Sequence, residues 1–355
     1  MRVAGVISLL ILLNACGVLE TQQPASVNSG TEPQAEIKTQ SESTHHAVTP
    51  QPALVDTIDE MAASAAAQSV VQQIAIAKAA SKNAASVESL CKEVGDRLGS
   101  VSVADCLAEK FSAAKVVSVE GRAIIYQRYL PLADKEPKAK VLLVGGIHGD
   151  EYSSVSIVFK WLQTLDEYHS GLFDWYIIPL LNPDGLLQQK AQRQNANGVD
   201  LNRNFPTPNW DIDAPKYWKK TSKNVRRYPG PSAGSEVESQ LLMNVIDEFE
   251  PDVIVSVHAP HSLVDYDGPP KAPNRIGDLQ LRCLGVYPGS LGNYAGVHKG
   301  VQVITIELSS AGIMPEDTEV SSMWTDLIRY LVSNEKFQQQ QSAAASNGDA
   351  AADVN

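Results

Sequence analysis

The stretch Val141–Glu151, which reads VLLVGGIHGDE, joins an apolar run to two potential metal ligands. Val141–Val144 is short and uncharged, which is typical of a strand covered on both faces. Two glycines end the run, and His148 and Glu151 follow three residues apart. A helix beginning near Gly149 would hold the imidazole and the carboxylate together at the carboxyl end of the strand, where open α/β sheets bind ligands. Both residue types are ligands of catalytic zinc, which keeps a fourth position open for water.

Strand-like and helical segments alternate through the middle of the chain. This alternation predicts an α/β domain with a mixed or mostly parallel central sheet flanked by helices. We place this catalytic domain at residues 118–336. The expected strands are Ala123–Arg128, Val141–Val144, Trp175–Leu180, Val253–Val257 and Val303–Leu308, and the expected helices are Glu151–Leu165 and Glu236–Phe249.

Two further strands finish on side chains that zinc hydrolysis requires. The apolar run at residues 253–257 ends directly on His258, and the run at 303–306 ends on Glu307. A carboxylate at such a position must be solvated, paired or used as a base. Beside a zinc site, Glu307 would act as the general base, and His258 would join His148 and Glu151 as the third ligand. Each residue alone could be an ordinary polar side chain in a loop, but three strands ending this way favour a catalytic zinc site.

A polar, glycine-containing loop, residues 195–206, supplies groups suited to an anionic substrate. Arg203 can bind a carboxylate through two hydrogen bonds, and Asn202 can add a neutral one. Upstream of this loop, Arg193 is placed to stabilise a developing oxyanion.

These motifs, in their order along the chain, resemble the zinc metallocarboxypeptidase family typified by the pancreatic carboxypeptidases. The resemblance covers about residues 118–330, and the run NGVDLNRNFP at residues 197–206 is its most specific part. It implies a carboxypeptidase-like fold that binds one Zn²⁺ per chain. It also implies site roles: His148, Glu151 and His258 as zinc ligands, Asn202 and Arg203 as the carboxylate clamp, Arg193 as the oxyanion group, and Glu307 as the base.

Within this family, three segments look most like the murein peptide amidases: GGIHGDE, His258–Pro269 and Gly289–Gly296. That resemblance implies cleavage of the γ-D-glutamyl–diaminopimelate bond in murein peptides. By the same analogy the specificity pocket lies around residues 290–293, where polar Asn293 suits a charged substrate side chain. The chain departs from the pancreatic members at their substrate-capping tyrosine, whose position falls near Cys283 or Leu284.

Other functions compete with this interpretation. A general zinc carboxypeptidase would trim peptides or peptidoglycan stems at another bond. A desuccinylase-like amide hydrolase would share the first motif, but the loop at 197–206 and the export signal count against it. A catalytically dead lipoprotein that only binds cell-wall peptides would lack the base, and Glu307 is present. The formal net charge of −12 argues against nucleic acid as a partner.

The first residues predict export and a lipid anchor. An apolar run, residues 6–13, is too short for an ordinary membrane-spanning helix. The sequence Leu13-Asn14-Ala15-Cys16 that closes it resembles a bacterial lipobox, which implies a signal peptide at 1–16 and lipidation of Cys16. An ordinary signal peptide that contains Cys16 is the alternative. We therefore expect a lipid-anchored periplasmic protein, with Gly17 favouring the outer membrane of a Gram-negative bacterium.

Composition divides the remainder of the chain. Residues 17–56 are polar and nearly free of aromatic side chains, so we expect a flexible tether, and residues 337–355 predict a disordered tail. Residues 57–117 are expected to form a helical N-terminal subdomain. In an oxidising compartment Cys91 and Cys106 are the best candidates for a disulfide, the alternative being two free core thiols.

Overall fold

The computed structural model describes residues 86–133, 135–269 and 271–334. The predicted signal peptide, the lipidation of Cys16, the tether and the tail lie outside these residues, as do residues 57–85 of the expected helical subdomain. Among the described residues, no helix is both long and apolar enough to cross a membrane.

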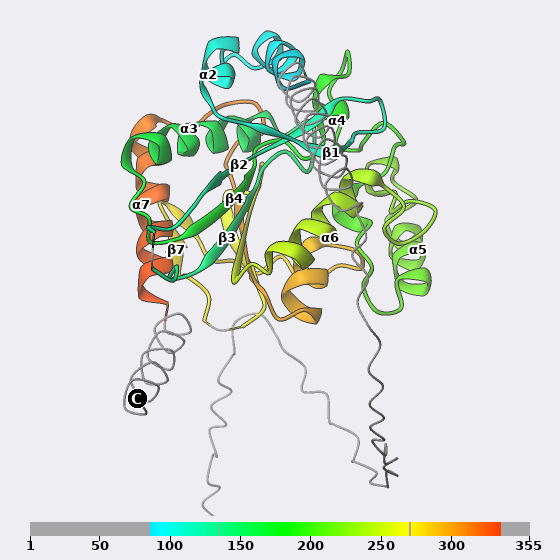
Figure 1. The fold of residues 1–355 in the computed structure, drawn as a ribbon. Coiled ribbons are helices and arrows are strands. Elements are labelled where there is room, and N and C mark those ends of the chain that lie inside the picture. Colours follow the sequence, from blue (N-terminus) through cyan, green and yellow to red (C-terminus); the bar gives the residue numbers. More distant parts are fainter. Residues whose placement is uncertain (1–85, 134, 270, 335–355) are drawn as a thin grey trace, which may run out of the picture. The chain divides into compact units, whose positions relative to one another are not determined.

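The centre of the fold is a seven-stranded mixed sheet (Figure 1). Strands β4, β3, β5 and β9 run parallel, while β2 and β6 run antiparallel to their neighbours in this group. The predicted class, a mixed α/β sheet flanked by helices, is confirmed. In spatial order the strands are β1 (Ser112–Val117), β2 (Ala123–Tyr129), β4 (Asp174–Ile178), β3 (Lys140–Val144), β5 (Val253–His258), β9 (Gln302–Glu307) and β6 (Leu263–Asp267).

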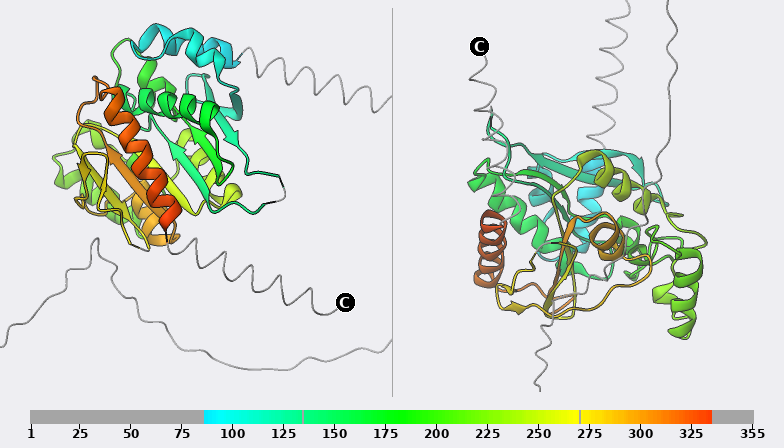
Figure 2. Two further views of the ribbon diagram at one scale, coloured as in Figure 1. Left: turned by 90° about the vertical axis from the view of Figure 1, so that its left-hand side faces the viewer. Right: turned by 90° about the horizontal axis from the view of Figure 1, so that it is seen from below.

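Helices cover both faces of the sheet (Figures 1 and 2). Helices α3 (Tyr152–Tyr168) and α7 (Asp317–Ser333) pack on one face. Helix α6 (Val237–Phe249) and the π-helix η3 (Gly292–His298) pack on the other. The shorter elements are α2 (Val103–Ala108), α4 (Pro183–Leu187), η1 (Leu201–Arg203), α5 (Trp210–Lys220), η2 (Val225–Arg227), β7 (Arg275–Ile276) and β8 (Leu279–Gln280).

The unbroken apolar run of β3 follows from this layered packing. Successive side chains of a strand point to opposite faces. Val141 and Leu143 accordingly belong to the core beneath α3 and α7, whereas Leu142 and Val144 belong to the core beneath α6. A strand buried on both faces needs apolar residues at every position, so the strand shows no polar alternation.

The N-terminal subdomain begins as expected but ends earlier. Residues 86–97 are helical, and a disulfide joins Cys91 to Cys106 in α2. The expected boundary at residue 117 is wrong, because Ser112–Val117 forms the edge strand β1 and pairs with β2. The first three residues of this strand are half-buried and the last three are exposed, and its sequence SAAKVV continues an alanine-rich region. Its pairing with β2, rather than its own pattern, makes it a strand.

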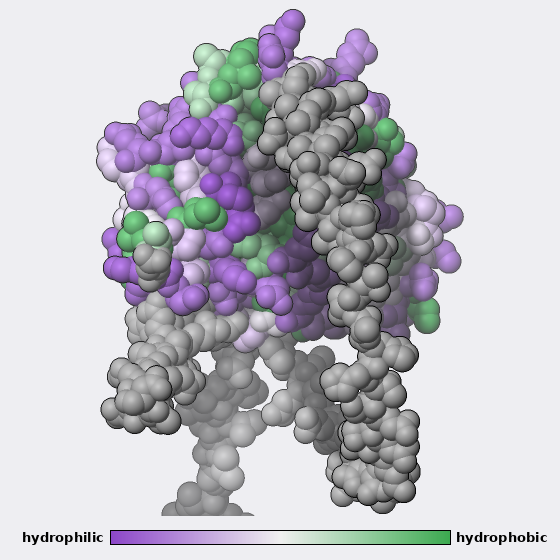
Figure 3. Space-filling model, viewed as in Figure 1, coloured by the Kyte–Doolittle hydropathy of each residue, from purple (hydrophilic) through white to green (hydrophobic). Residues whose placement is uncertain are grey.

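The surface facing the viewer in Figure 3 is mainly hydrophilic. Where no grey atoms cover this face, its hydrophobic residues appear in small separate patches.

Candidate metal and catalytic site

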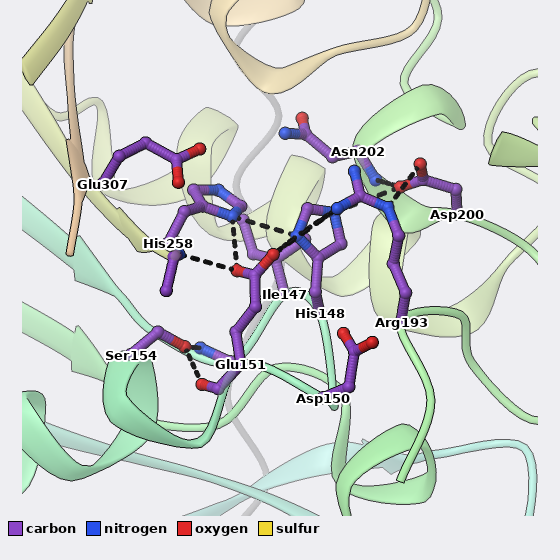
Figure 4. Close-up of polar contacts among 12 residues, drawn as sticks. Ile147, His148, Asp150, Glu151, Ser154, Arg193, Asp200, Asn202, His258 and Glu307 are labelled. Carbon is purple, nitrogen blue, oxygen red and sulfur yellow. Dashed lines mark hydrogen bonds and ion pairs between the residues drawn. The ribbon is translucent and has the colours of Figure 1, made fainter. Parts of the chain in front are cut away.

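Three neighbouring strands place the predicted residues close together at the carboxyl ends of the parallel strands (Figure 4). β5 pairs with β9 so that their last residues, His258 and Glu307, stand side by side. β3 pairs with β5 on the other side, and the loop that follows β3 carries His148 and Glu151. Helix α3 begins only at Tyr152, so both of these residues belong to the turn before the helix.

The donor atoms of His148, Glu151 and His258 converge on one point. Glu151 Oε1 lies 2.8 Å from His148 Nδ1, and its Oε2 lies 3.0 Å from His258 Nδ1. The two Nδ1 atoms are themselves 3.1 Å apart. All three residues are buried, and they form the group of described His, Cys, Asp and Glu side chains close enough to hold a metal ion. Two imidazole nitrogens and a carboxylate are a ligand set of catalytic zinc, so these residues fit the metal.

Two residues that sequence analysis missed orient these imidazoles. Asp200 Oδ1 lies 3.2 Å from His148 Nε2, and Ser256 Oγ lies 3.0 Å from His258 Nε2. A carboxylate only accepts hydrogen bonds, so the proton of His148 resides on Nε2 and its Nδ1 lone pair faces the other donors. Two features of the sequence could have indicated these residues. Asp200 is a carboxylate inside the loop motif, and Ser256 lies two positions before His258, on the same face of β5.

Arg193 balances the charge of this buried cluster. Its Nε donates to Asp200 Oδ2 at 2.9 Å, and its Nη1 lies 3.1 Å from His148 Nδ1 and 3.4 Å from Glu151 Oε1. Burial by itself would raise the pKa of Asp200, but the Arg193 guanidinium and His148 hold that pKa well below its usual range. A fixed positive charge therefore stands next to the metal donors, where an oxyanion would develop.

A cleft of about 500 Å³ opens over these groups. Glu307 faces it from beside His258, and its Oε2 accepts a hydrogen bond from the backbone nitrogen of His261 at 3.4 Å. The predicted metal, catalytic and clamp residues all line this cleft: His148, Glu151, Arg193, Asn202, Arg203, His258 and Glu307.

Arg203 presents a buried cation to the cleft. Its guanidinium carbon lies 4.7 Å from the ring centroid of Tyr287 and 5.6 Å from that of Tyr217. Burial lowers the pKa of Arg203, and its Nε has no hydrogen-bond partner within the described residues. Asn202 lies beside it, with its Oδ1 accepting from the backbone nitrogen of Leu291 at 2.8 Å. This pair of side chains is suited to an anionic group of a substrate.

The predicted role of Asn293 is wrong, because this residue does not line the cleft. Its Nδ2 donates to the backbone oxygen of Tyr287 at 3.0 Å, which fixes the first turn of η3. Ser290 and Gly292, its neighbours in the chain, do line the cleft. Tyr287 also lines it, near the position expected for a capping tyrosine.

Comparisons with known proteins agree with this geometry. Residues 105–281 match the model of the zinc carboxypeptidase family. Murein peptide amidase A of Escherichia coli K12 is 39% identical over 127 residues, which cover 35% of this chain and 50% of that protein. The Vibrio campbellii protein of the same name is 34% identical over 140 residues, or 39% of this chain and 54% of that protein. The chain thus spans about half the length of these curated relatives.

A solved structure shows the same fold. The carboxypeptidase A of Helicoverpa armigera superposes with a TM-score of 0.51 at 19% identity. The superposition covers 66% of this chain and 73% of the insect chain. At this level of identity the likeness concerns the fold alone.

Proposed function

The chain belongs to the zinc carboxypeptidase family. We therefore propose that it is a zinc-dependent hydrolase of amide bonds in cell-wall peptides. One observation carries the proposal: a three-donor metal site, a carboxylate base and a buried arginine line a single cleft. A metallopeptidase that acts next to a free carboxylate needs these three components.

Bound zinc would lower the pKa of a water molecule and polarise the scissile carbonyl group. The residues of the chain perform the remaining steps. Glu307 accepts a proton from the attacking water and delivers it to the leaving amine. Arg193 stabilises the oxyanion of the tetrahedral intermediate through its guanidinium group. Asp200 and Ser256 hold the two histidines in position throughout.

We propose further that the substrate is a murein peptide and that the scissile bond joins γ-D-glutamate to diaminopimelate. The relatives named murein peptide amidase A support this choice of substrate. In a murein tripeptide the diaminopimelate residue carries a free carboxylate next to the scissile nitrogen. Arg203 and Asn202 would bind that carboxylate and so determine which amide lies over the metal site.

The location of the protein is also a proposal. The lipobox-like sequence ending at Cys16 supports a periplasmic enzyme held by a lipid at the outer membrane. Metabolic labelling with a fatty acid tests it: the label should be incorporated by the unaltered chain and lost in Cys16→Ser. Equal labelling of both proteins would contradict the anchor.

The test of function uses the purified, zinc-loaded full chain and the peptide L-Ala-γ-D-Glu-meso-diaminopimelate. We expect mass spectrometry to find L-Ala-D-Glu and free diaminopimelate. Arg203→Ala should lower kcat/KM by orders of magnitude, since it leaves the substrate carboxylate without its buried partner. Asp211→Asn, an exposed change on α5, is the control and should leave the rate unaltered.

The alternative function gives a different result. A general carboxypeptidase would cut hippuryl-type synthetic peptides as fast as the murein tripeptide, or would release residues from the carboxyl end of longer stems. Either product pattern would contradict the amidase proposal while leaving the zinc-dependent chemistry in place.

A further inference from the structure

Two buried carboxylates occupy the part of the cleft beyond the catalytic base. Asp265 and Asp267 lie on β6, the antiparallel strand at the edge of the sheet, and both line the cleft. They are only 6% and 8% exposed. Neither residue takes part in the chemistry described above, so their presence calls for another role. We refer to this pair as the acidic end of the cleft.

Strand register places the acidic end relative to Glu307. β6 pairs with β9 so that Leu263 lies opposite Glu307 and Asp265 lies opposite Thr305. Directly opposed residues of an antiparallel pair point to the same face, and each strand residue advances about 3.4 Å. Asp265 therefore lies roughly 7 Å further along the sheet than Glu307, and Asp267 roughly 7 Å further again. A long substrate side chain leaving the reacting centre would extend along this row.

Asp267 has no partner for its charge. Within the described residues its carboxylate makes no hydrogen bond and no ion pair, whereas Asp265 Oδ1 accepts from the backbone nitrogen of Leu284 at 3.0 Å. Burial raises the pKa of Asp267 to about 7, and the neighbouring Asp265 adds to that rise. Burying a carboxylate without a partner costs free energy, which a cationic ligand would offset.

The π-helix η3 shapes the space around Asp267. A Cβ atom built on Gly292 would lie 1.9 Å from Asp267 Oδ2, and one built on Gly296 would lie 2.6 Å from Asp267 Cβ. The two glycines thus let the aspartate lie directly against the helix backbone. Because Gly292 also lines the cleft, no side chain at that position covers the carboxylate.

The arginines that line the cleft are engaged elsewhere. Arg193 pairs with Asp200, Arg203 lies over the ring of Tyr287, and Arg226 pairs with Asp150 at 2.6 Å. The fourth, Arg227, donates to the hydroxyl of Tyr217. None of these contacts reaches Asp267, so the charge at the acidic end is left for a ligand.

The acidic end of the cleft is better suited to bind an organic cation than a second metal ion. Among the described residues, the cluster of His, Cys, Asp and Glu close enough to share a metal is the one at His148, and it does not include Asp265 or Asp267. An ammonium group needs only one or two carboxylate acceptors and donates up to three hydrogen bonds.

We propose that Asp267, supported by Asp265, binds an ammonium group at the far end of the substrate side chain on the leaving-amine side of the scissile bond. In diaminopimelate this group is the second amino group. The inference rests on the proposed function, since it assigns the specificity pocket of the same cleft. Arg203 would then bind the carboxylate next to the scissile nitrogen, and Asp267 would bind the ammonium group of the zwitterionic far end, which selects for the second amino group and for the length of the side chain.

A matched pair of substrates tests the ammonium receptor. The first is L-Ala-γ-D-Glu-meso-diaminopimelate, and the second carries 2-aminopimelate, which lacks only the far amino group. We expect the unaltered, zinc-loaded chain to prefer the first by about ten- to a hundredfold in kcat/KM, the range of a charge-assisted hydrogen bond. Asp267→Asn should remove this preference by slowing only the first reaction. Asp278→Asn, an exposed change on the same protein, should keep it.

Calorimetric titration with free meso-diaminopimelate and free 2-aminopimelate separates this inference from the proposed function. If neither tripeptide is hydrolysed, the proposed function fails, yet tighter binding of diaminopimelate that Asp267→Asn abolishes would still establish the receptor. Equal binding of the two amino acids by the unaltered chain would overturn the receptor. An Asp267→Asn variant that slows both tripeptides equally would overturn it as well.

Discussion

Asp200 Oδ1 lies 3.2 Å from His148 Nε2, although 52 residues separate the two in the chain. This contact turns the lone pair of His148 Nδ1 toward Glu151 and His258. The other oxygen of the same carboxylate accepts a hydrogen bond from Arg193 Nε. One buried aspartate thus orients a metal ligand and also holds the arginine that would stabilise the oxyanion. We therefore expect Asp200 to matter nearly as much as the ligands themselves.

Asp200→Asn should weaken zinc binding by about 10- to 100-fold, the usual effect of losing a partner of a ligating histidine. Competition with a chromogenic chelator measures the affinity. Asp213→Asn, outside the cleft lining on α5, serves as the control. An unchanged zinc affinity in Asp200→Asn would show that His148 needs no such support.

Removing a metal ligand should remove the metal. We expect one Zn²⁺ per unaltered chain, and little or none in His148→Ala or His258→Ala, because two remaining ligands hold zinc poorly. Elemental analysis of the purified proteins gives the count. Full occupancy in both variants would disprove the assignment of the site.

Replacing the base should separate binding from turnover. Glu307→Gln keeps the shape of the side chain but cannot accept a proton, so kcat should fall by roughly 10²–10⁴-fold. Zinc content and substrate affinity should stay near those of the unaltered chain. Turnover close to normal would place the general base elsewhere in the cleft.

The unpaired charge of Asp267 should make the empty protein less stable at alkaline pH. Its pKa is raised from 3.8 to about 7 in the folded state, so folding favours the protonated form. The contribution of this group to the free energy of unfolding is complete below about pH 4 and is lost as the pH rises through 7. Asp267→Asn should therefore stabilise the protein by roughly 2–4 kcal/mol at pH 8 and by little at pH 4. Denaturant unfolding at both pH values tests this, and equal gains at the two would contradict it.

Loss of the disulfide should loosen the N-terminal subdomain. Cys91 and Cys106 are 15 residues apart, and the loop-entropy model assigns about 3 kcal/mol to such a crosslink. The double change Cys91→Ser with Cys106→Ser should lower the free energy of unfolding by that order. Unfolding curves that coincide with and without reductant would show that the crosslink adds no stability.

The sequence by itself determined which side chains form the catalytic site at the carboxyl ends of the central strands. Apolar runs without polar alternation predicted the central strands, because a strand covered on both faces leaves no other pattern. Two of these runs ended on His258 and Glu307, and His148 followed a third, so the carboxyl ends of parallel strands had to bring these three side chains together. These inferences needed only local pattern and the geometry of parallel sheets.

Only the tertiary structure decided the parts that depend on pairing between distant segments. β1 is a strand because β2 offers it an edge, and Asp265 and Asp267 enter the cleft because β6 pairs antiparallel with β9. Asn293 turns away because the backbone oxygen of Tyr287 accepts its amide. Strand register and close packing decide which side chains become neighbours across strands. Both involve segments that are far apart in the chain, so these contacts cannot be predicted from the local sequence.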